Sequence, residues 1–360
     1  MPRQDVGDQG RTQVEAGSAE HSEPDGAGLQ SAHGGHRTSR LLGRGDRVTV
    51  LDDFNDFYHP ARKRANVEPF LEHEARQERY RLVEGDIRDA ALVDELFAHG
   101  RFDAVVHLAA RAGVRPSLQQ PILYEDVNCI GTLRLLEAAR RHGPEVFTFG
   151  SSSSVYGINE KVPFAESDPV DQPISPYATT KRAGELLCYN YHHLYGLKVS
   201  CLRFFTVYGP AQRPEMAIHK FTDLLARGET VPMFGDGASR RDYTYVDDIL
   251  DGLVAAMDAA PGFEILNLGG AETTALADLV HWLAAELAVE PDAVRLPEQR
   301  ALEGLPGVLE VPHGEVDVAE EQHRPPVLRP QGAGRRVLTR LSLGPDMPDR
   351  AGDPVPVVVR

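Results

Sequence analysis

Apolar residues follow two alternating patterns along this chain. Short runs of β-branched and aromatic residues predict strands, and longer stretches with apolar residues three or four positions apart predict helices. The predicted strands are VTVLDD (48–53), RLVEGDI (81–87), AVVHLAA (104–110), VFTFGSSSS (146–154), KVSCLRFF (198–205) and EILNLGG (264–270). The predicted helices are 90–100, 131–143, 179–196, 245–260 and 274–288. Strands that alternate with helices predict an α/β fold, in which helices cover both faces of a parallel sheet.

Composition divides the chain into three parts. Residues 1–40 contain no Ile, Phe, Tyr, Trp, Lys, Asn or Cys. The segment 298–360 has eight arginines but no lysine and no aromatic residue. Segments of this kind bury too little apolar surface to fold, so both are predicted to be atypical and disordered. The folded core is therefore predicted at 41–297.

Charge and cysteine content exclude several classes of function. A net charge of -16 argues against binding nucleic acid through a basic surface. The three cysteines are widely spaced and lack metal-ligand spacing, and His192 and His193 have no third ligand nearby, so no metal site is expected. The chain has no apolar run of about 18 residues and no signal-peptide core. We expect a cytoplasmic protein that does not bind membranes.

The strand VTVLDD ends on Asp52, and this position predicts a dinucleotide site. A carboxylate at the end of such a strand binds the adenosine ribose in a Rossmann sheet. The three glycines of the phosphate-binding loop should then lie at 28, 31 and 34, where the chain has Gly28, Ser31 and Gly34. Ser31 would crowd the pyrophosphate, and the preceding residues are too polar for a central strand. We therefore expect the sheet to lack its central strand and its cofactor loop.

The stretch SPYATTKRAGEL places Tyr177 and Lys181 four residues apart, on one face of a predicted helix. By itself this spacing is more typical of a surface pair. Here, however, the upstream strand runs out into SSSSVYG, and earlier strands end in DI and HLAA. The carboxyl ends of the strands are where doubly wound sheets bind ligands. Hydroxyl, phenol and amine groups are therefore expected to converge there.

Five motifs carry a family resemblance. They are, in chain order, HLAARAGVRPS, SSSSVYG, SPYATTK, RFFTVYGP and RRDYTYVDDI. Together they resemble the extended short-chain dehydrogenase/reductase family of nucleotide-sugar epimerases and dehydratases, most closely its UDP-glucuronate 4-epimerase branch. The resemblance implies a Rossmann-like doubly wound parallel sheet, mainly in 41–205, and a smaller substrate-binding lobe, mainly in 206–245 and 271–297. It also implies tightly bound NAD as the cofactor.

The resemblance implies three catalytic residues. Tyr177 would be the base that takes the proton from the sugar 4-hydroxyl while a hydride passes from C4 to the nicotinamide. A free phenol has a pKa of ~10, so the ammonium of Lys181 and the positive nicotinamide would stabilise the phenolate. Lys181 would also bind the nicotinamide ribose. Ser152 would share a hydrogen bond with the 4-oxygen of the sugar.

Further positions match the family's ligand contacts. The implied cofactor residues are Asp52 and Asn55 near the adenosine ribose, Asp86 and Ile87 beside the adenine, and Leu108, Ala109, Ala110, Arg111 and Asn128 along the cofactor. The implied substrate residues are Arg241 for the diphosphate, Thr206 and Arg213 for the sugar carboxylate, and Arg115 for the sugar. Arginine suits both anions because its planar donors pair with two oxygens. Two structural alternatives remain, a buried strand end for Leu108 to Ala110 and a helix cap for Asn128.

The serine segment indicates the type of reaction. Family dehydratases and decarboxylases carry an acidic residue before Val-Tyr-Gly, whereas SSSSVYG has none. The resemblance therefore implies a 4-epimerase that converts UDP-glucuronate to UDP-galacturonate, and it suggests a homodimer formed through a helix pair. The alternative is a degenerate or frame-disrupted, non-catalytic member of the family. Both ends have the Arg-, Gly-, Pro- and Ala-rich composition expected when GC-rich coding sequence is read in a wrong frame.

Overall fold

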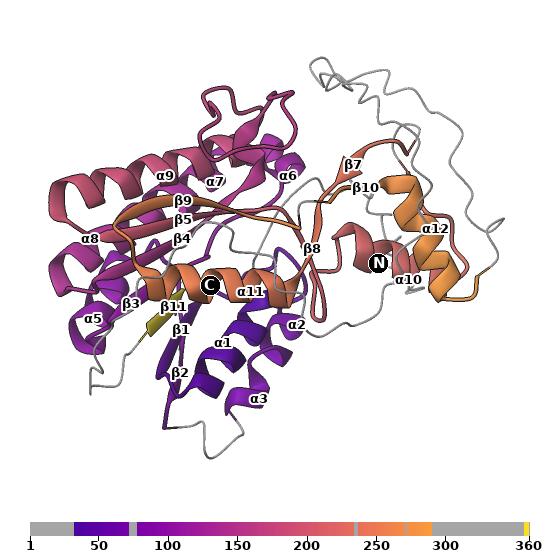
Figure 1. Ribbon diagram of the computed structural model, residues 1–360. Helices are drawn as coiled ribbons and strands as arrows, with labels where there is room; N and C mark the ends of the chain where they lie inside the picture. The colour runs from indigo at the N-terminus through magenta and orange to yellow at the C-terminus, as the bar shows by residue number, and fades with distance from the viewer. Residues whose placement is uncertain (1–31, 72–77, 234–236, 271, 290–355, 360) are drawn as a thin grey trace, which may run out of the picture.

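The computed structural model describes residues 32–71, 78–233, 237–270, 272–289 and 356–359. Within these residues seven strands form one sheet, in the order β2-β1-β11-β3-β4-β5-β9, and every neighbouring pair is parallel (Figure 1). The strands are β1 Val48–Asp52, β2 Tyr80–Glu84, β3 Ala104–His107, β4 Val146–Ser152, β5 Lys198–Phe204, β9 Phe263–Leu268 and β11 Pro356–Val359. The predicted α/β class and parallel sheet are confirmed, and each predicted strand segment overlaps an observed strand.

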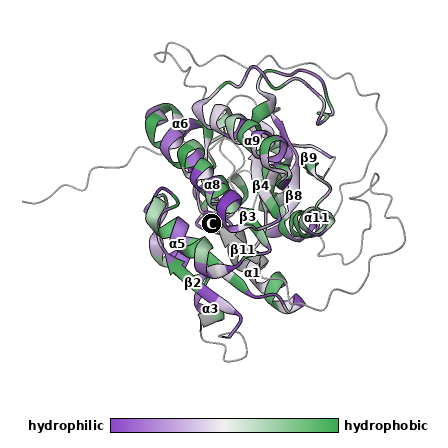
Figure 2. Ribbon diagram, turned by 90° about the vertical axis from the view of Figure 1, so that its left-hand side faces the viewer, coloured by the Kyte–Doolittle hydropathy of each residue, from purple (hydrophilic) through white to green (hydrophobic). Residues whose placement is uncertain are grey.

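Helices cover both faces of the sheet. One face carries α5 Ala90–Gly100, α8 Thr132–His142 and α9 Pro176–Tyr195, and the other carries α1 Ala32–Arg44 and α11 Val246–Ala259 (Figure 2). The strands supply both cores by alternation: Leu51 and Val105 pack against the first set of helices, and Val50 and Val106 against the second. Among the helices that the structure describes, none is long and apolar enough to cross a membrane.

Shorter elements connect the strands and the main helices. They are α2 Pro60–Ala65, α3 Glu68–Leu71, α6 Val114–Gln119, α7 Pro121–Tyr124, the π-helical segment η1 Glu125–Gly131 and the 3-10 turn η2 Ser153–Tyr156. A smaller lobe contains β6 Thr206–Tyr208, α10 Ala217–Ala226, β7 Arg240–Arg241, β8 Tyr243–Tyr245, β10 Thr274–Ala275 and α12 Leu276–Glu286. Helices α10 and α12 bury a separate apolar core that includes Phe221, Leu225, Val280 and Leu283. This lobe lies beside the sheet, at the right of Figure 1.

The two ends of the chain depart from the sequence predictions. Helix α1 begins at Ala32, although composition assigned residues 1–40 to a disordered segment. Strand β11 comes from the segment predicted to be a disordered tail, and Val357 pairs with Thr49 on one side and Val105 on the other. The central position that we expected to be empty is therefore filled. The other residues of the two predicted segments, 1–31, 298–355 and 360, lie outside the described residues.

The reason for this correction is physical. A valine run has high β propensity, and the facing edges of β1 and β3 offer unpaired backbone groups on both sides. The average composition of residues 298–360 does not show a run as short as this one. It also does not show the open edges, because the partners of β11 lie far away in the sequence. With β11 in place, the carboxyl ends of β1, β3 and β4 are brought to one edge of a continuous sheet.

Candidate active site

Helix α9 and strand β4 bring the three predicted catalytic side chains together. The helix begins with Pro176 after Ser175, whose side chain accepts a hydrogen bond from the backbone N–H of Ala178 (3.1 Å). This cap fixes the first turn, and Tyr177 in that turn is only 2% exposed. Ser152, the last residue of β4, is fully buried and hydrogen-bonded to the phenol of Tyr177. The end of β4 and the start of α9 thus bring the hydroxyl groups of Ser152 and Tyr177 together in a buried pair.

Lys181 lies one turn further along α9 and is also buried. Its ammonium donates a hydrogen bond to the backbone carbonyl of Gly150 (2.7 Å) and lies 6.0 Å from the ring centroid of Tyr177. Burial lowers the pKa of Lys181 to about 8. The lysine therefore ties α9 to β4 two residues before Ser152.

The environment of Tyr177 differs from the sequence prediction in one respect. Burial raises the pKa of its phenol to about 12, and the groups that oppose this shift are the hydrogen bond with Ser152 and the positive charge of Arg213. We expected Lys181 to be the cation that favours the phenolate. In this structure Arg213 is the cation that favours the phenolate. The ammonium of Lys181 is directed at the carbonyl of Gly150 instead.

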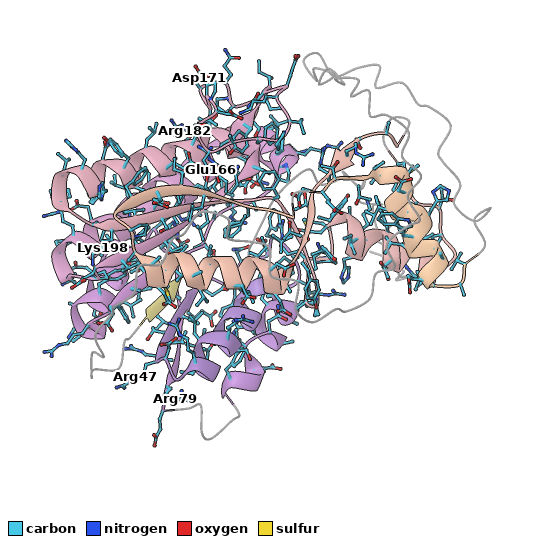
Figure 3. The ribbon with its side chains drawn as sticks, viewed as in Figure 1. Arg47, Arg79, Glu166, Asp171, Arg182 and Lys198 are labelled. Atoms are coloured by element: carbon cyan, nitrogen blue, oxygen red, sulfur yellow. The ribbon has the colours of Figure 1, made fainter. Side chains whose placement is uncertain are left out.

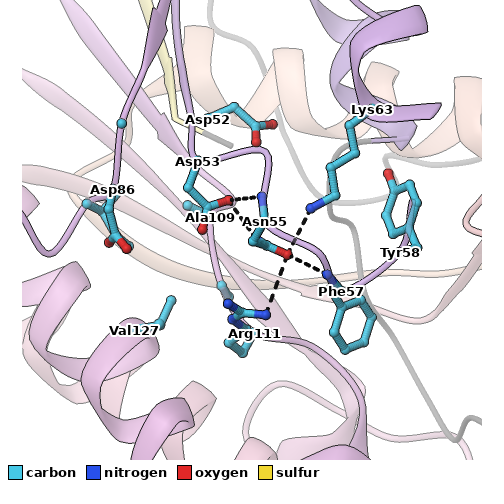
Figure 4. A pocket seen from close by; sticks show the side chains of 13 residues that line it. Asp52, Asp53, Asn55, Phe57, Tyr58, Lys63, Asp86, Ala109, Arg111 and Val127 are labelled. Carbon is cyan, nitrogen blue, oxygen red and sulfur yellow. Dashed lines mark hydrogen bonds between the residues drawn. The ribbon is translucent and has the colours of Figure 1, made fainter. Parts of the chain in front are cut away.

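A cavity that is open to solvent adjoins the carboxyl ends of β1, β2 and β3. Its lining includes seven predicted cofactor residues, namely Asp52, Asn55, Asp86, Ile87, Ala109, Ala110 and Arg111. Figure 4 shows Asn55 between the side chains of Lys63 and Arg111. The structure thus gathers the residues predicted for the adenosine half of the cofactor into one cavity.

Four predicted cofactor residues do not line this cavity: Tyr177 and Lys181, which lie in the catalytic cluster, and Leu108 and Asn128. Leu108 is 3% exposed and packs in the apolar core that faces α1 and α11, as the buried-strand alternative expected. Asn128 is also buried, but it does not cap a helix. Its side chain accepts from the backbone N–H of Arg111 (2.7 Å) and donates to the carbonyl of Arg111 (3.0 Å) and to Thr180 (2.9 Å). Asn128 therefore holds the Arg111 backbone in place against α9.

The sequence reasoning missed Lys63. This side chain is 3% exposed, lines the cavity and donates a hydrogen bond to the Oδ1 atom of Asn55 (2.9 Å). Burial lowers its pKa, and nearby Asp52 and Asp53 oppose that effect. The same oxygen of Asn55 accepts from Arg111 (3.5 Å). No motif marked Lys63, since a lysine in a charged helical turn is normally solvated.

The residues of the cavity fit NAD in part. The carboxylate of Asp52 is buried at the end of β1, where a ribose is bound in a Rossmann sheet, and Lys63 and Arg111 supply positive charge beside it. The predicted loop positions Gly28 and Ser31 lie outside the described residues. Among the described residues the cavity wall has no glycine loop for the pyrophosphate, and the contacts predicted for the two ends of the cofactor stay predictions.

Among the predicted substrate residues, Arg213 lies closest to the assembled site. It is 3% exposed, its guanidinium is 5.4 Å from the ring centroid of Phe57 in the cavity wall, and its Nη1 is 2.6 Å from the Oε1 atom of Glu215. Sequence reasoning did not identify Glu215. Within the described residues, Nε and Nη1 of Arg213 have no well-oriented hydrogen-bond acceptor. Arg213 is therefore a buried cation with donor capacity to spare.

The other three substrate candidates lie in different settings. Thr206 begins β6 and is half-buried, with its backbone N–H donating to the carbonyl of Asp242 (3.1 Å). Arg115 is half-buried on α6. Arg241 is exposed on β7 in the smaller lobe, where its Nη1 donates to the carbonyl of Arg240 (3.0 Å). Their roles toward the substrate stay predictions.

The parallel doubly wound sheet, the acid at the end of β1 and the Ser-Tyr-Lys arrangement define the class of Rossmann-type dehydrogenase-like enzymes. The model of the NAD dependent epimerase/dehydratase family matches residues 27–269, and the chain belongs to this family. Among its relatives, UDP-glucuronate 4-epimerase 4 of Arabidopsis thaliana is 42% identical over 274 residues, which cover 71% of this chain and 62% of the relative. The chain therefore spans less than two thirds of the length of that relative.

Two other similar proteins are also named as 4-epimerases of UDP-glucuronate. UDP-glucuronate 4-epimerase of Thermodesulfobacterium geofontis is 43% identical over 230 residues, covering 64% of this chain and 69% of the relative. Among solved structures, the UDP-glucuronic acid 4-epimerase of Bacillus cereus, in complex with UDP-glucuronic acid and NAD, has a TM-score of 0.65 and 33% identity. The match covers 72% of this chain and 81% of that structure. These comparisons do not support the alternative of a non-catalytic family member.

Proposed function

We propose that this protein is an NAD-dependent 4-epimerase of a UDP-sugar, and that it converts UDP-glucuronate to UDP-galacturonate. The observation that carries the proposal is the buried hydrogen bond between Ser152 and Tyr177, flanked by Lys181 and the cation Arg213. The names of the relatives support the same reaction. A base at one oxygen and a carboxylate-binding cation nearby are what this epimerisation requires.

In the proposed mechanism, Tyr177 removes the proton from the sugar 4-hydroxyl and later returns it to the same oxygen. When bound, NAD supplies the hydride acceptor and donor for C4. The Ser152 hydroxyl donates to the developing charge, and the positive charge of Arg213 favours the phenolate form of Tyr177. Because all three side chains are buried, water is kept from the oxidised sugar.

The surroundings of the serine segment support epimerisation rather than dehydration. Elimination of water needs an acid-base group beside the sugar C5 and C6. Residues 151–154 are all serines, and the nearest acid to them, Glu185, accepts hydrogen bonds from Ser151 and Arg203. A carboxylate held in this way is not available to shuttle protons to the substrate.

The substrate contacts are proposed as follows. Arg213 and Thr206 bind the sugar carboxylate, Arg115 lies toward the sugar, and Arg241 binds the diphosphate from the smaller lobe. Support for Arg213 comes from its burial and from its Nε atom, which has no hydrogen-bond acceptor among the described residues. A carboxylate would gain charge-assisted hydrogen bonds from this guanidinium. It would also compete with Glu215 for the guanidinium.

We also propose a cytoplasmic homodimer. The support is a set of exposed apolar side chains on α6, α7, η1 and α9, namely Leu118, Ile122, Ile130, Leu186, Tyr189, Leu194 and Tyr195. Large apolar side chains gathered on neighbouring helices favour association. The cysteines are free, which suits a reducing compartment.

The test is to incubate the purified protein with NAD and UDP-glucuronate and to follow the sugar by NMR. UDP-galacturonate should appear without loss of water or carbon dioxide, and the Tyr177→Phe variant should form none at a comparable rate. Release of carbon dioxide, or accumulation of a 4-keto-6-deoxy sugar, would show that the reaction belongs to another branch of the family.

A further inference from the structure

A buried ion pair lies directly behind the site. Glu185 is fully buried on α9, one helical turn beyond Lys181 and about two turns beyond Tyr177, so the three share a helix face. Arg203, on β5, is only 1% exposed. Its Nε and Nη2 atoms donate to the two carboxylate oxygens of Glu185 at 2.8 and 2.9 Å. This is a bidentate pair, which holds both planes in a fixed orientation.

The ion pair extends into a network that reaches the catalytic strand. Ser151 donates to Oε1 of Glu185 (2.6 Å), and Arg203 donates to the phenol oxygen of Tyr156 (3.0 Å). Tyr156 in turn donates to Asn267 of β9 (2.6 Å). Arg182 and the backbone of Glu166, both labelled in Figure 3, add a donor to Glu185 and an acceptor for Arg203. The network therefore joins β4, β5, β9 and α9.

Stability alone gives a poor account of this arrangement. Removing two charges from water is costly, and replacing a buried ion pair by apolar residues of similar volume is often neutral or stabilising. Breaking such a pair by removing one partner is strongly destabilising. Geometry offers a better account, because the ion pair joins α9, which carries Tyr177 and Lys181, to Ser151 on β4, the neighbour of Ser152.

We propose that Glu185 and Arg203 are positioning residues for the epimerase reaction, which set the Ser152–Tyr177 hydrogen bond by fixing β4 against α9. The inference rests on the proposed function. Ser151 and Ser152 are adjacent and point to opposite faces of the strand, so an anchor on Ser151 fixes the peptide that carries Ser152. The bond from Lys181 to Gly150 crosses the same interface.

The decisive variant replaces both partners, Glu185→Leu with Arg203→Met. It removes the two buried charges together, and the guanidinium of Arg182, which loses Glu185 as a partner, is 30% exposed and can be solvated, so thermal stability should stay close to that of the natural chain. The turnover number kcat should fall by about tenfold to a hundredfold, because a small misplacement of catalytic groups has that effect. KM should change by less than about twofold, since neither residue is placed against the substrate. Equal stability with unchanged kcat would overturn the proposal.

A second variant decides the matter if the double variant does not fold. Ser151→Ala removes only the link to Glu185 and keeps the ion pair, and it should lower kcat in the same direction. The matched control is Ser200→Ala, a buried serine of β5 whose hydroxyl faces the carbonyl of Ala256 (3.4 Å), and it should leave kcat unchanged. If the two alanine variants behave alike, the network does not position the site.

A readout independent of activity separates this inference from the proposed function. In protein labelled with ¹³C at the tyrosine Cζ atom, the Tyr177 resonance is identified by its loss in Tyr177→Phe. It should shift in Ser151→Ala and not in Ser200→Ala, because it reports on the phenol hydrogen bond. Absence of epimerisation in the natural chain would refute the function alone. An unshifted resonance would refute the positioning role, whatever the activity.

Discussion

Strand β11 should be essential to the sheet, and a Val357→Pro substitution tests this directly. Val357 lies between Thr49 of β1 and Val105 of β3, and an interior strand directs each backbone N–H into one of its two ladders. Proline has no N–H and fixes φ near -65°, so it is excluded from the interior of a sheet. The substitution therefore disrupts the backbone pairing of β11. The expected effect does not depend on how the side chains of β11 pack.

The expected magnitude follows from the pairing. Loss of one ladder bond leaves a buried carbonyl without its donor, which costs about 1–3 kcal/mol. The ring clash brings the total to roughly 3 kcal/mol. In a domain of this size 1 kcal/mol shifts the melting temperature by about 2–4 °C, so the midpoint should fall by roughly 6–12 °C. The affinity for NAD should fall as well, because the cavity lies at the carboxyl ends of the strands that β11 joins.

The measurement is thermal unfolding by circular dichroism, combined with NAD binding by calorimetry. The control is Val357→Ile, which keeps the N–H donor and the β-branched side chain and should melt within about 2 °C of the natural chain. If Val357→Pro melts with the control and binds NAD equally well, β11 is not a structural member of the sheet. The sheet would then tolerate an open central position, contrary to this reasoning.

Three further outcomes are expected. Arg213→Ala should lower activity on both substrates, because the phenolate of Tyr177 loses a nearby positive charge, but the loss in kcat/KM for UDP-glucuronate should be larger by ~2 kcal/mol or more than the loss for UDP-glucose; equal losses in steady-state assays would mean that Arg213 does not bind the carboxylate. Tyr177→Phe should lower kcat by about 10²–10⁴-fold with NAD binding retained, and Ser152→Ala should lower it less. Burial lowers the pKa of His107 from 6.5 to about 3, so the unfolded chain binds a proton that the folded chain rejects between these values. Its contribution is thus lost as the pH falls through that window, by up to about 1.4 kcal/mol per unit; urea unfolding of His107→Gln should show a shallower acid dependence, and parallel curves would contradict the argument.

Local sequence was a good guide to the sheet and to the pair of Tyr177 and Lys181. The strand segments could be located because a buried parallel strand requires a short continuous apolar run. Tyr177 and Lys181 could be paired because the helix period is local. Ser152 was identified only through the family resemblance, because four serines stand together in SSSSVYG and periodicity does not distinguish them.

Buried charges were predicted poorly. Lys63, Glu215, Glu185 and Arg203 have side chains that are normally exposed, so a sequence reading assigns them to the surface. Lys63, Glu185 and Arg203 are buried because a partner elsewhere in the fold satisfies each of them, as Arg203 on β5 satisfies Glu185 on α9, whereas Glu215 pairs with Arg213 of its own loop. The interaction between the two partners offsets the desolvation cost of burying each charge. The sequence around one partner therefore does not show that it will be buried.

The sequence by itself determined the α/β class, the positions of six strands and the identity of the residues that meet at their carboxyl ends. Hydrophobic periodicity and local hydrogen bonding depend only on residues that are close together in the sequence, so they can be recognised without the tertiary structure. Only the tertiary structure decided that β11, Pro356–Val359, takes the central place between β1 and β3. That choice depends on backbone groups some 300 residues apart, whose pairing gains free energy only once both edges are already formed.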